Sequence, residues 1–372
     1  MRHANLIGTV LALSLVFVAS SAADVITVCT DGGDHATIQG ALDVASAGDE
    51  IVVCCGTYFE NIVMTNGVHL RSETGDPGCV TINGLQQGSV VTCDDLDETT
   101  IIAGFTITGG VGNDGGGMVV TDSSPTVVNC IFVGNTASDG GGMEVASSGE
   151  SVSAPRIVNC LFQNNHANVG VNPDGGAVRI VDSEAHFANC TFYGNTAILH
   201  GGGIACIRSV SEFVNCVFWG NSDGGGTGES AQLYSDDSSS VTVTHSCIQG
   251  LDTFAGDGNI GDDPVLVDPD GPDDDPATWE DNDLRLCFLS PCIDAGDSTS
   301  VPDGVLVDLD GCGRIVDAPM VPDTGIPAGI VPVVADMGAY ELPHFRLGDC
   351  NRDGDVNAYD IDGFILLVGG GC

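Results

Sequence analysis

The sequence predicts an all-β solenoid, and three observations support that prediction: a repeated motif, an alternation of apolar residues, and frequent turn-forming residues. The motif is Asn-Cys, a Phe two residues after the Cys, an Asn, and then two or three glycines. Its four copies begin at Asn129, Asn159, Asn189 and Asn215, so the period is about 26 to 30 residues. A period of this size indicates one supersecondary unit stacked on copies of itself.

Each repeat has the pattern of short strands. Val128, Cys130 and Phe132 alternate with Asn129 and Ile131, which is the two-residue period of a strand. Between residues 100 and 250 we find no helical period, and glycine and asparagine interrupt the chain every few residues. We therefore expect one coil per repeat, with equivalent residues of successive coils about 4.8 Å apart, and a solenoid of about ten coils.

Stacking of the coils predicts three ladders of side chains. An inward ladder of cysteines comprises Cys130, Cys160, Cys190 and Cys216, continued by Cys247. A second ladder lies in the core and comprises Phe132, Phe162, Phe192 and Phe218. A third lies at a turn, where side-chain amides can bond along the stack, and comprises Asn135, Asn165, Asn195 and Asn221.

The repeat resembles that of the polymorphic outer-membrane proteins of chlamydiae, in which F-x-x-N is paired with G-G-[AI]-[ILV]. The resemblance implies a right-handed parallel β-helix with the pectin-lyase-like fold. Residues 35–62, HATIQGALDVASAGDEIVVCCGTYFENI, resemble the opening of such proteins. Within them, one apolar helix face is expected to cap the first coil and comprises Ile38, Ala41, Leu42 and Ala45. Three closing motifs, SPCIDAGD, DLDGCGR and DMGAYE, extend the resemblance to residue 342.

The chain divides into four predicted regions. Residues 1–23 are expected to be a secretory signal peptide, because Arg2 and His3 precede an apolar run and small residues precede Asp24. The β-helix is predicted over 24–256, an acidic loop and closing segment over 257–343, and a calcium-binding repeat over 344–372. No second apolar run is long enough to cross a membrane. We therefore expect an exported protein, extracellular or on the cell surface.

Sixteen cysteines in an exported chain predict disulfides. The ladder cysteines point the same way in neighbouring coils, which is poor geometry for a disulfide, so buried thiols are expected there. Bridges are expected elsewhere: among Cys29, Cys54, Cys55, Cys79 and Cys93, or between Cys287 and Cys292.

The charge excludes some partners. The formal net charge is −43, and all nine basic residues are arginines. A nucleic-acid partner is excluded, because phosphate binding needs a basic surface. Polyanionic polysaccharides are repelled unless divalent cations bridge them. A solubilising surface adapted to salt or calcium is the plainer interpretation of this charge.

The last residues contain a predicted calcium loop, GDCNRDGDVNAYDIDGFILL over 348–367. Oxygen-bearing side chains at positions one, three and five, glycine at six and an acid at twelve give the EF-hand spacing. The loop resembles the type I dockerin repeat, and the ligands implied are Asp349, Asn351, Asp353, Asp355 through its backbone, and Asp360. Dockerins contain two such repeats and one stands here. Binding of a cohesin-like protein is therefore less expected than calcium binding, and a calcium-stapled tail, a truncated product and a vestigial module stay open.

Catalytic candidates are few. β-helix polysaccharide lyases use Arg or Lys as the base, which draws attention to Arg156, Arg179 and Arg208. Alignment of the coils places Arg179 level with Ala205, and Asp182 level with Arg208. Arg208 and Asp182 are then either a base beside a carboxylate or a surface ion pair, and we favour the ion pair. The motifs of β-helix glycoside hydrolases are absent from the sequence in the required order.

A row of acidic residues precedes the glycine runs, with His200 in the remaining coil: Asp114, Asp139, Asp174 and Asp223. The row is either a calcium- or sugar-binding strip or ordinary Asp-Gly turn chemistry. The function that we predict is non-catalytic adhesion or carbohydrate-associated binding. The alternative is an extracellular polysaccharide lyase or other carbohydrate-active enzyme with a dockerin-like docking module.

Overall fold

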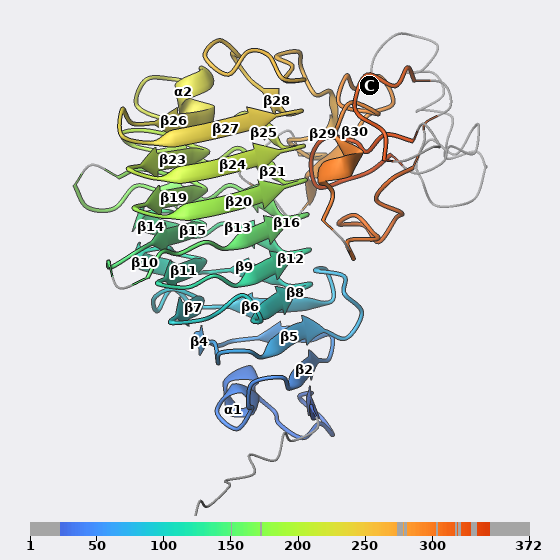
Figure 1. Cartoon of the computed structure of the whole chain (residues 1–372). Coiled ribbons are helices and arrows are strands. Elements are labelled where there is room, and N and C mark those ends of the chain that lie inside the picture. The colour runs from blue at the N-terminus through green and yellow to red at the C-terminus, as the bar shows by residue number, and fades with distance from the viewer. Residues whose placement is uncertain are drawn as a thin grey trace, which may run out of the picture.

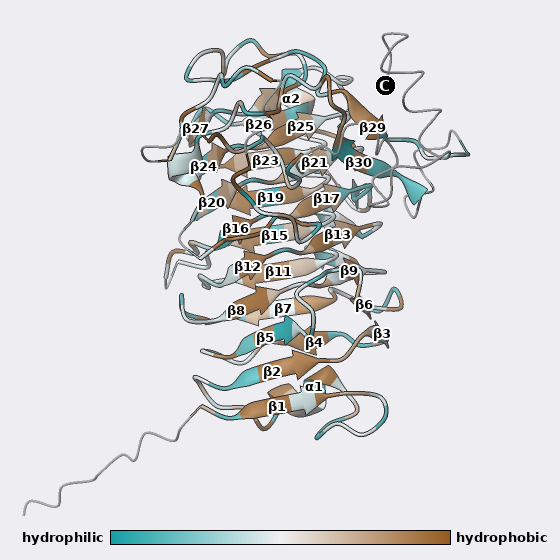
Figure 2. Cartoon of the chain, turned by 90° about the vertical axis from the view of Figure 1, so that its right-hand side faces the viewer, coloured by the Kyte–Doolittle hydropathy of each residue, from teal (hydrophilic) through white to brown (hydrophobic). Residues whose placement is uncertain are grey.

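The computed structural model describes residues 23–149, 151–171, 173–273, 278, 281–302, 304–316, 318, 321–328 and 333–342. Nearly all of its regular structure is β-strand, arranged as a parallel β-helix in which successive coils stack along one axis (Figure 1). The strands are mainly hydrophobic and many of the connecting loops are hydrophilic (Figure 2). The predicted fold class is confirmed. The predicted signal peptide and the predicted calcium loop lie outside the described residues, apart from Ala23.

Three long parallel sheets form the walls of the solenoid. Sheet A contains β1 (Val25–Val28), β2 (Glu50–Val53), β5 (His69–Ser72), β8 (Ile101–Ala103), β12 (Thr126–Val128), β16 (Arg156–Val158), β20 (Glu184–Ala188), β24 (Val210–Val214) and β27 (Ser240–Thr244). Sheet B contains β3 (Gly56–Tyr58), β6 (Val80–Asn83), β9 (Thr106–Thr108), β13 (Ile131–Val133), β17 (Leu161–Gln163), β21 (Thr191–Tyr193), β25 (Val217–Trp219) and β28 (Cys247–Ile248). Sheet C contains β4 (Ile62–Val63), β7 (Val91–Asp94), β11 (Met118–Thr121), β15 (Met143–Ala146), β19 (Val178–Val181), β23 (Ile204–Ile207) and β26 (Leu233–Ser235).

The remaining elements are short. Sheet D lies between sheets B and C along the chain and contains β10 (Val111–Asp114), β14 (Thr136–Asp139), β18 (His166–Ala167) and β22 (Thr196–Ala197). An antiparallel pair, β29 (Leu266–Asp268) and β30 (Asp283–Leu286), follows the solenoid. The helices are α1 (Ile38–Leu42), α2 (Glu229–Gln232) and a 3-10 turn, η2 (Ser298–Ser300).

The predicted N-terminal helix caps the first coils. In α1, Thr37 is the N-cap and accepts a hydrogen bond from Gly40 N. The Glu60 carboxylate accepts two more, from Ile38 N at 2.8 Å and Gln39 N at 3.0 Å, so the free amides of the first turn are satisfied. Ile38, Ala41 and Leu42 are buried, as the apolar face predicted, and Ala45 packs against them.

The Asn of each Asn-Cys pair forms the corner between sheets A and B. Asn129, Asn159, Asn189 and Asn215 all have φ between 50° and 54°, in the left-handed region that asparagine tolerates better than most residues. This corner interrupts the alternation of faces, so Val127, rather than Val128, points into the core with Cys130 and Phe132. The expectation that Val128 shares their face is therefore wrong. Val128 packs against an outer cluster instead.

The phenylalanine ladder is confirmed. Ring centroids of Phe132 and Phe162 are 4.7 Å apart, those of Phe162 and Phe192 5.0 Å, and those of Phe192 and Phe218 4.8 Å, with nearly parallel planes. These spacings match the distance between neighbouring strands. The rings are therefore stacked by the register of sheet B and fill the centre of the solenoid.

The cysteine ladder is confirmed for its first four members, which are buried thiols: Cys130, Cys160, Cys190 and Cys216. Each donates to the carbonyl oxygen two residues earlier over 3.3 Å. Burial raises the pKa of the Cys190 thiol well above its ordinary value, so it stays protonated.

Cys247 does not continue the ladder. It pairs with Val217, and Ser246 occupies the position level with Cys216. A shift of one residue moves a side chain to the opposite face of a strand. Cys247 therefore faces outward into the cluster that contains Cys292.

The asparagine ladder is also confirmed. Asn135 Nδ2 donates to Asn165 Oδ1, Asn165 Nδ2 to Asn195 Oδ1 and Asn195 Nδ2 to Asn221 Oδ1, over 2.9–3.1 Å. Gln232 Oε1 ends the series by accepting from Asn221 Nδ2 at 2.8 Å. All five side chains are fully buried, so each amide depends on its neighbours for hydrogen bonds.

The glycine runs allow close contact between coils. A Cβ on Gly141 would lie 2.4 Å from the Gly176 carbonyl oxygen, and one on Gly142 would lie 2.7 Å from that of Ala177. Larger residues would separate the backbones. The repeated motif is thus chiefly structural, with Asn at the corner, Cys and Phe in the core, and Gly at the contact between coils.

The described residues of the closing segment, which runs from 262 to 342, pack against the side of the later coils and do not extend the stack (Figure 1). Asn159 Nδ2 donates to Val307 O at 2.7 Å, and Asn215 exchanges hydrogen bonds with the backbone of Asp297. Sheets A, B and C have nine, eight and seven strands. The expected ten coils are therefore too many, because the length counted for them includes this lateral segment.

Two predicted disulfides are present, Cys29–Cys54 and Cys55–Cys79, which join neighbouring coils at the N-terminal end. Cys93 is a buried thiol. The expected Cys287–Cys292 bridge is wrong: Cys287 is disulfide-bonded, but Cys292 is a buried thiol. Sequence spacing could not show this, because Cys292 faces Cys247 on the solenoid.

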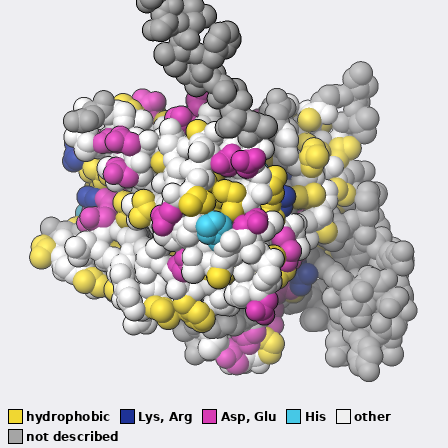
Figure 3. Space-filling model, turned by 90° about the horizontal axis from the view of Figure 1, so that it is seen from below, with side chains coloured by type: hydrophobic (Ala, Val, Ile, Leu, Met, Phe, Trp, Pro, Cys, Tyr) yellow, Lys and Arg dark blue, Asp and Glu magenta, His cyan; other side chains and the backbone are white. Residues whose placement is uncertain are grey.

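The excess of acidic over basic residues in the sequence is visible at the surface of the protein (Figure 3). Seen from the N-terminal end, acidic side chains are more numerous than basic ones (Figure 3). Within the described ranges, no helix combines the length and apolar character needed to cross a membrane.

Candidate functional site

A polar cluster on the outer face of sheet C is the strongest candidate site. The outward positions of β15, β19, β23 and β26 align in register as Glu144, Arg179, Ala205 and Tyr234. Beside this row lies an edge formed by Asp139, at the end of β14 in sheet D, and by Asp174 and His200, which form an isolated parallel bridge. We call Asp139, Glu144, Asp174, Arg179, His200 and Tyr234 the sheet C cluster. It joins four successive coils.

Arg179 is the centre of the first half of the sheet C cluster. Its Nη1 donates to Glu144 Oε1 at 2.7 Å, and its Nε lies 3.7 Å from Asp139 Oδ1. The second distance is an ion pair but too long for a hydrogen bond, so Arg179 Nε has no hydrogen-bond partner. Glu144 Oε2 is likewise buried without a partner. The pair therefore keeps one donor and one acceptor unused.

Glu144 is an unusual outward residue because its side chain is only 6% exposed. The pKa of Glu144 is raised to about 8, chiefly by burial and also by the neighbouring Asp114, while Arg179 opposes the shift. The cost of removing the carboxylate from water outweighs the attraction of Arg179. A carboxyl group that carries its proton near neutral pH can donate a hydrogen bond or act as a general acid.

An aromatic stack forms the second half. The rings of His200 and Tyr234 lie with centroids 4.2 Å apart and planes 13° apart. Asp174 Oδ1 lies 3.1 Å from His200 Nδ1 and also accepts from His200 N, which fixes the imidazole against Tyr234. Burial raises the pKa of Asp174, and His200 opposes that shift. The side chain of His200 is 39% exposed, so the stack reaches the surface.

The row of aspartates connects the two halves and also has a plain structural role. Asp139 Oδ1 accepts from Asp174 N at 3.2 Å, Asp174 Oδ1 from His200 N at 3.1 Å, and Asp223 Oδ2 from Gly201 N at 3.3 Å. Each carboxylate thus binds the backbone of a neighbouring coil, which supports the turn interpretation for this part of the row. Asp114 is exposed and level with Asp139.

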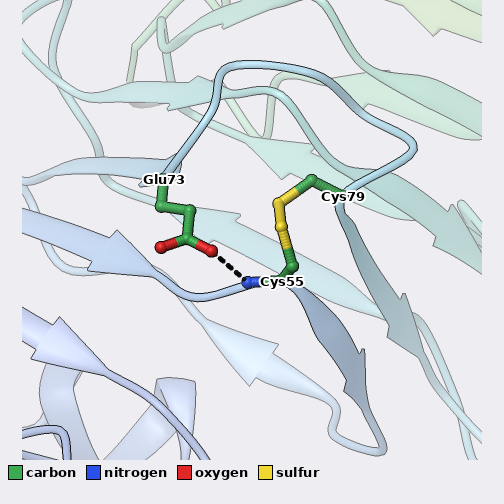
Figure 4. A group of neighbouring side chains, drawn as sticks. All are labelled: Cys55, Glu73 and Cys79. Carbon is green, nitrogen blue, oxygen red and sulfur yellow. Dashed lines mark hydrogen bonds between the residues drawn. A yellow bond between two sulfur atoms is a disulfide. The ribbon is translucent and has the colours of Figure 1, made fainter.

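Metal-binding geometry is absent from the sheet C cluster. Among the described residues, one group brings three potential ligand atoms close together, Cys55, Glu73 and Cys79. Two of its members form a disulfide, and Glu73 Oε1 accepts from Cys55 N at 2.9 Å (Figure 4). Its sulfurs are bonded to each other, so this group is a structural link between coils. The predicted calcium ligands Asp349, Asn351, Asp353, Asp355 and Asp360 lie outside the described residues.

The other predicted pair is separate from this cluster. Arg208 and Asp182 are stacked neighbours, with Arg208 Nε 2.8 Å and Nη2 2.6 Å from the two Asp182 oxygens. Their side chains are 53% and 44% exposed. The two side chains therefore form a bidentate ion pair at the surface. Arg179, another candidate base, is already engaged by two carboxylates.

Sequence reasoning missed Glu144 and Tyr234. Glu144 could have been found by aligning the glycine runs GGGME and DGGAVR, which places it level with Arg179. Tyr234 follows α2, which lies between the glycine run of this repeat and β26, so the spacing of the other repeats does not reach it.

Comparisons with known proteins give only distant likenesses. No known family and no curated protein matches the chain. Among solved structures, a pectin methylesterase from Aspergillus niger shares 15% identity over 77% of this chain and 96% of that chain, with a TM-score of 0.35. A pectate lyase, Pel9A, shares 14% identity over 86% of this chain and 97% of that chain, with a TM-score of 0.39. The parallel β-helix is therefore established by the strand topology, and the function is argued from the residues of this chain.

Proposed function

We propose that the protein binds a neutral polysaccharide, without cleaving it, across the sheet C cluster. The observation that carries this proposal is the His200–Tyr234 stack, an aromatic surface continuous with hydrogen-bonding groups from three further strands. Binding sites commonly combine aromatic side chains with a few fixed polar groups. A sugar ring offers an apolar face for such a stack and hydroxyls for carboxylates and a guanidinium.

The charge favours a neutral chain. The whole protein has a formal charge of −43, and the sheet C cluster supplies one arginine against three acidic side chains. A polyanion would be repelled at this surface unless divalent cations bridged it. The cluster extends over neighbouring coils about 4.8 Å apart, so it presents repeated contacts along the solenoid axis to an extended ligand.

Retention on immobilised polysaccharides tests the proposal. The mature chain, residues 24–372, is passed over neutral and acidic polysaccharides with calcium and with chelator. Neutral polysaccharide should retain the wild type in both conditions. Tyr234→Ala should weaken retention at least tenfold, and the matched Tyr193→Phe change in another sheet should not. Equal retention of wild type and Tyr234→Ala would refute the assignment of the site.

Enzymatic cleavage is the second candidate, and Glu144 is the observation that favours it. Its raised pKa, to about 8, suits a general acid, and it lies beside a cation. The enzyme would be a polysaccharide lyase or another carbohydrate-active enzyme. New unsaturated or reducing ends in the same assay, lost in Glu144→Gln while retention persists, would replace the binding proposal with this one.

We also propose that the protein is exported, extracellular or on the cell surface, and binds calcium through its tail. Support comes from the apolar N-terminal run and from the EF-hand spacing of Asp349, Asn351, Asp353, Asp355 and Asp360. Calorimetric titration with calcium, comparing wild type with Asp349→Ala/Asp360→Ala, tests the second part. One strong site should disappear in the variant, and unchanged binding would refute the assignment. A cohesin-like partner would be sought only if that site is present.

A further inference from the structure

A groove separates the outer face of sheet A from Ser300, Pro302 and residues 304–307 of the closing segment. Its floor is formed by β8, β12, β16, β20 and β24, and its wall by these residues of the closing segment. It has two parts, with volumes of about 600 and 230 Å³, which share Arg156, Val158 and Pro302 as lining residues. The closing segment lies beside this side of the solenoid in Figure 1.

Arg156 distinguishes this groove from the rest of the surface. The structure describes six arginines, and five of them contact a carboxylate: Arg71, Arg179, Arg208, Arg285 and Arg314. Within the described residues, Arg156 has no such contact, and its side chain is exposed. In a chain with 52 acidic and nine basic residues, an arginine without a carboxylate partner is notable. Its guanidinium is available for an anionic group of a ligand.

The larger part of the groove is mainly apolar around that guanidinium. Aliphatic side chains line both sides: Ile101, Val128 and Val158 on the floor, and Val305, Leu306 and Val307 on the wall. Val158 and Val128 belong to an outer hydrophobic cluster that Val305 completes. Leu306 is 78% exposed, so an apolar surface remains for a ligand to cover.

The neighbours of Arg156 leave it accessible. In the register of sheet A, it lies between Thr126 and His186. The nearest acidic side chain along this row is Glu212, one coil further, which lies 3.3 Å from His186 Nδ1. Glu212 is therefore engaged by the imidazole, and the positive charge at the boundary of the two parts is not neutralised.

We propose that this groove binds a small organic acid with an aliphatic body, whose carboxylate is received by Arg156. A guanidinium can hold a carboxylate through two parallel hydrogen bonds. The volume of about 600 Å³ lies within the range of small-molecule sites, and its aliphatic walls suit a hydrocarbon chain. Repulsion by the acidic surface is screened beyond about 8 Å at physiological ionic strength, so the contact with Arg156 decides binding. This site is on a different sheet from the sheet C cluster and does not depend on the function proposed there.

Calorimetric titration with octanoate tests the proposal, with octan-1-ol as the uncharged ligand of equal chain length. Wild type should bind octanoate saturably. Arg156→Gln should weaken octanoate binding at least tenfold and leave octan-1-ol binding unchanged. Arg208→Gln, which removes an arginine elsewhere on the surface, should change neither. Leu306→Ser, at an exposed position, should weaken both ligands.

Three results would overturn the proposal. They are no saturable octanoate binding by the wild type, equal octanoate affinity in wild type and Arg156→Gln, and an equal loss in Arg208→Gln. Arg156 and Leu306 are exposed, so both variants are expected to fold. Circular dichroism before each titration checks this, and the two variants report on the groove independently.

Discussion

Arg179 and Glu144 form a hydrogen-bonded ion pair across two neighbouring coils, with Nη1 of the arginine 2.7 Å from Oε1 of the glutamate. The glutamate side chain is 6% exposed and the arginine side chain 22%. Where the pH is high enough to ionise Glu144, removing both charges from water costs free energy, and hydrogen bonds must offset that cost. Because Glu144 Oε2 and Arg179 Nε lack hydrogen-bond partners, the free-energy cost of burying this pair is only partly offset.

Glu144→Gln should change how stability depends on pH. The pKa of Glu144 is raised from 4.5 to about 8 in the folded protein, so folding favours its protonated form. That stability is fully present below about pH 4.5 and is lost as the pH rises through about 8. The free energy of unfolding of the wild type, relative to the variant, should therefore fall between pH 5 and pH 8.5. Urea unfolding at pH 5, 7 and 8.5 measures it.

Glu98→Gln is the control for that experiment, because Glu98 is exposed. Its difference from wild type should stay nearly constant over the same range. A constant difference for Glu144→Gln would show that Glu144 is ionised across the range and that Arg179 outweighs burial.

Arg179 and Arg208 should respond differently to removal. Arg179→Ala leaves the Glu144 carboxyl buried without its cation, and the free energy of unfolding should fall by about 3 kcal/mol at pH 8.5. The loss should be smaller at pH 5, where Glu144 is protonated. Arg208→Ala breaks an exposed pair and should cost less than about 1 kcal/mol. Urea midpoints of the two variants at both pH values give the comparison, and similar losses would contradict it.

The sequence was most informative where side chains repeat along the stack. The Phe and Asn ladders follow from the period alone, because parallel strands in register bring equivalent residues together. Errors arose where one residue changes the direction of the chain. The left-handed conformation of Asn129 places Val128 on the outer face. In the next case, Ser246 rather than Cys247 lies beside Cys216 on the neighbouring strand. Neither of these changes in side-chain direction alters the residues of the repeat motif, so the motif could not predict them.

The site was less predictable because it depends on contacts between different sheets. Arg179 was a candidate residue, and its predicted alignment with Ala205 on the neighbouring strand is confirmed. Its ion-pair partners, however, are Glu144 from β15 and Asp139 at the end of β14. The aromatic partner of His200 comes from a coil in which α2 separates the glycine run from the next strand. The sheet A groove exists because the closing segment packs against earlier coils. The repeat pattern does not predict this packing, because the closing segment is not part of the repeats.

Asn165→Ala should interrupt the asparagine ladder. It removes the acceptor for Asn135 N and Nδ2, and the donor to Asn195 Oδ1 and Phe132 O. Each of these buried groups would lose a hydrogen bond, at a cost of about 3 kcal/mol in the free energy of unfolding. Asn168→Ala, at an exposed position, should stay within about 0.5 kcal/mol of wild type. Denaturant unfolding of both variants checks this, and equal stabilities would count against the ladder as a source of stability.

Gly141→Ala should disturb the contact between coils, because the added Cβ would lie 2.4 Å from Gly176 O and 2.6 Å from His166 N. Both atoms belong to the backbone of the next coil, so they cannot rotate away as a side chain could. We expect a loss of at least about 2 kcal/mol in the free energy of unfolding. Gly228→Ala is the matched control: its Cβ would meet nothing within 4 Å and its φ is −70°. Thermal unfolding should therefore show a lowered midpoint for the first variant and little change for the second. If Gly141→Ala were as stable as wild type, the coils would have to separate without cost, which their hydrogen-bonded register opposes.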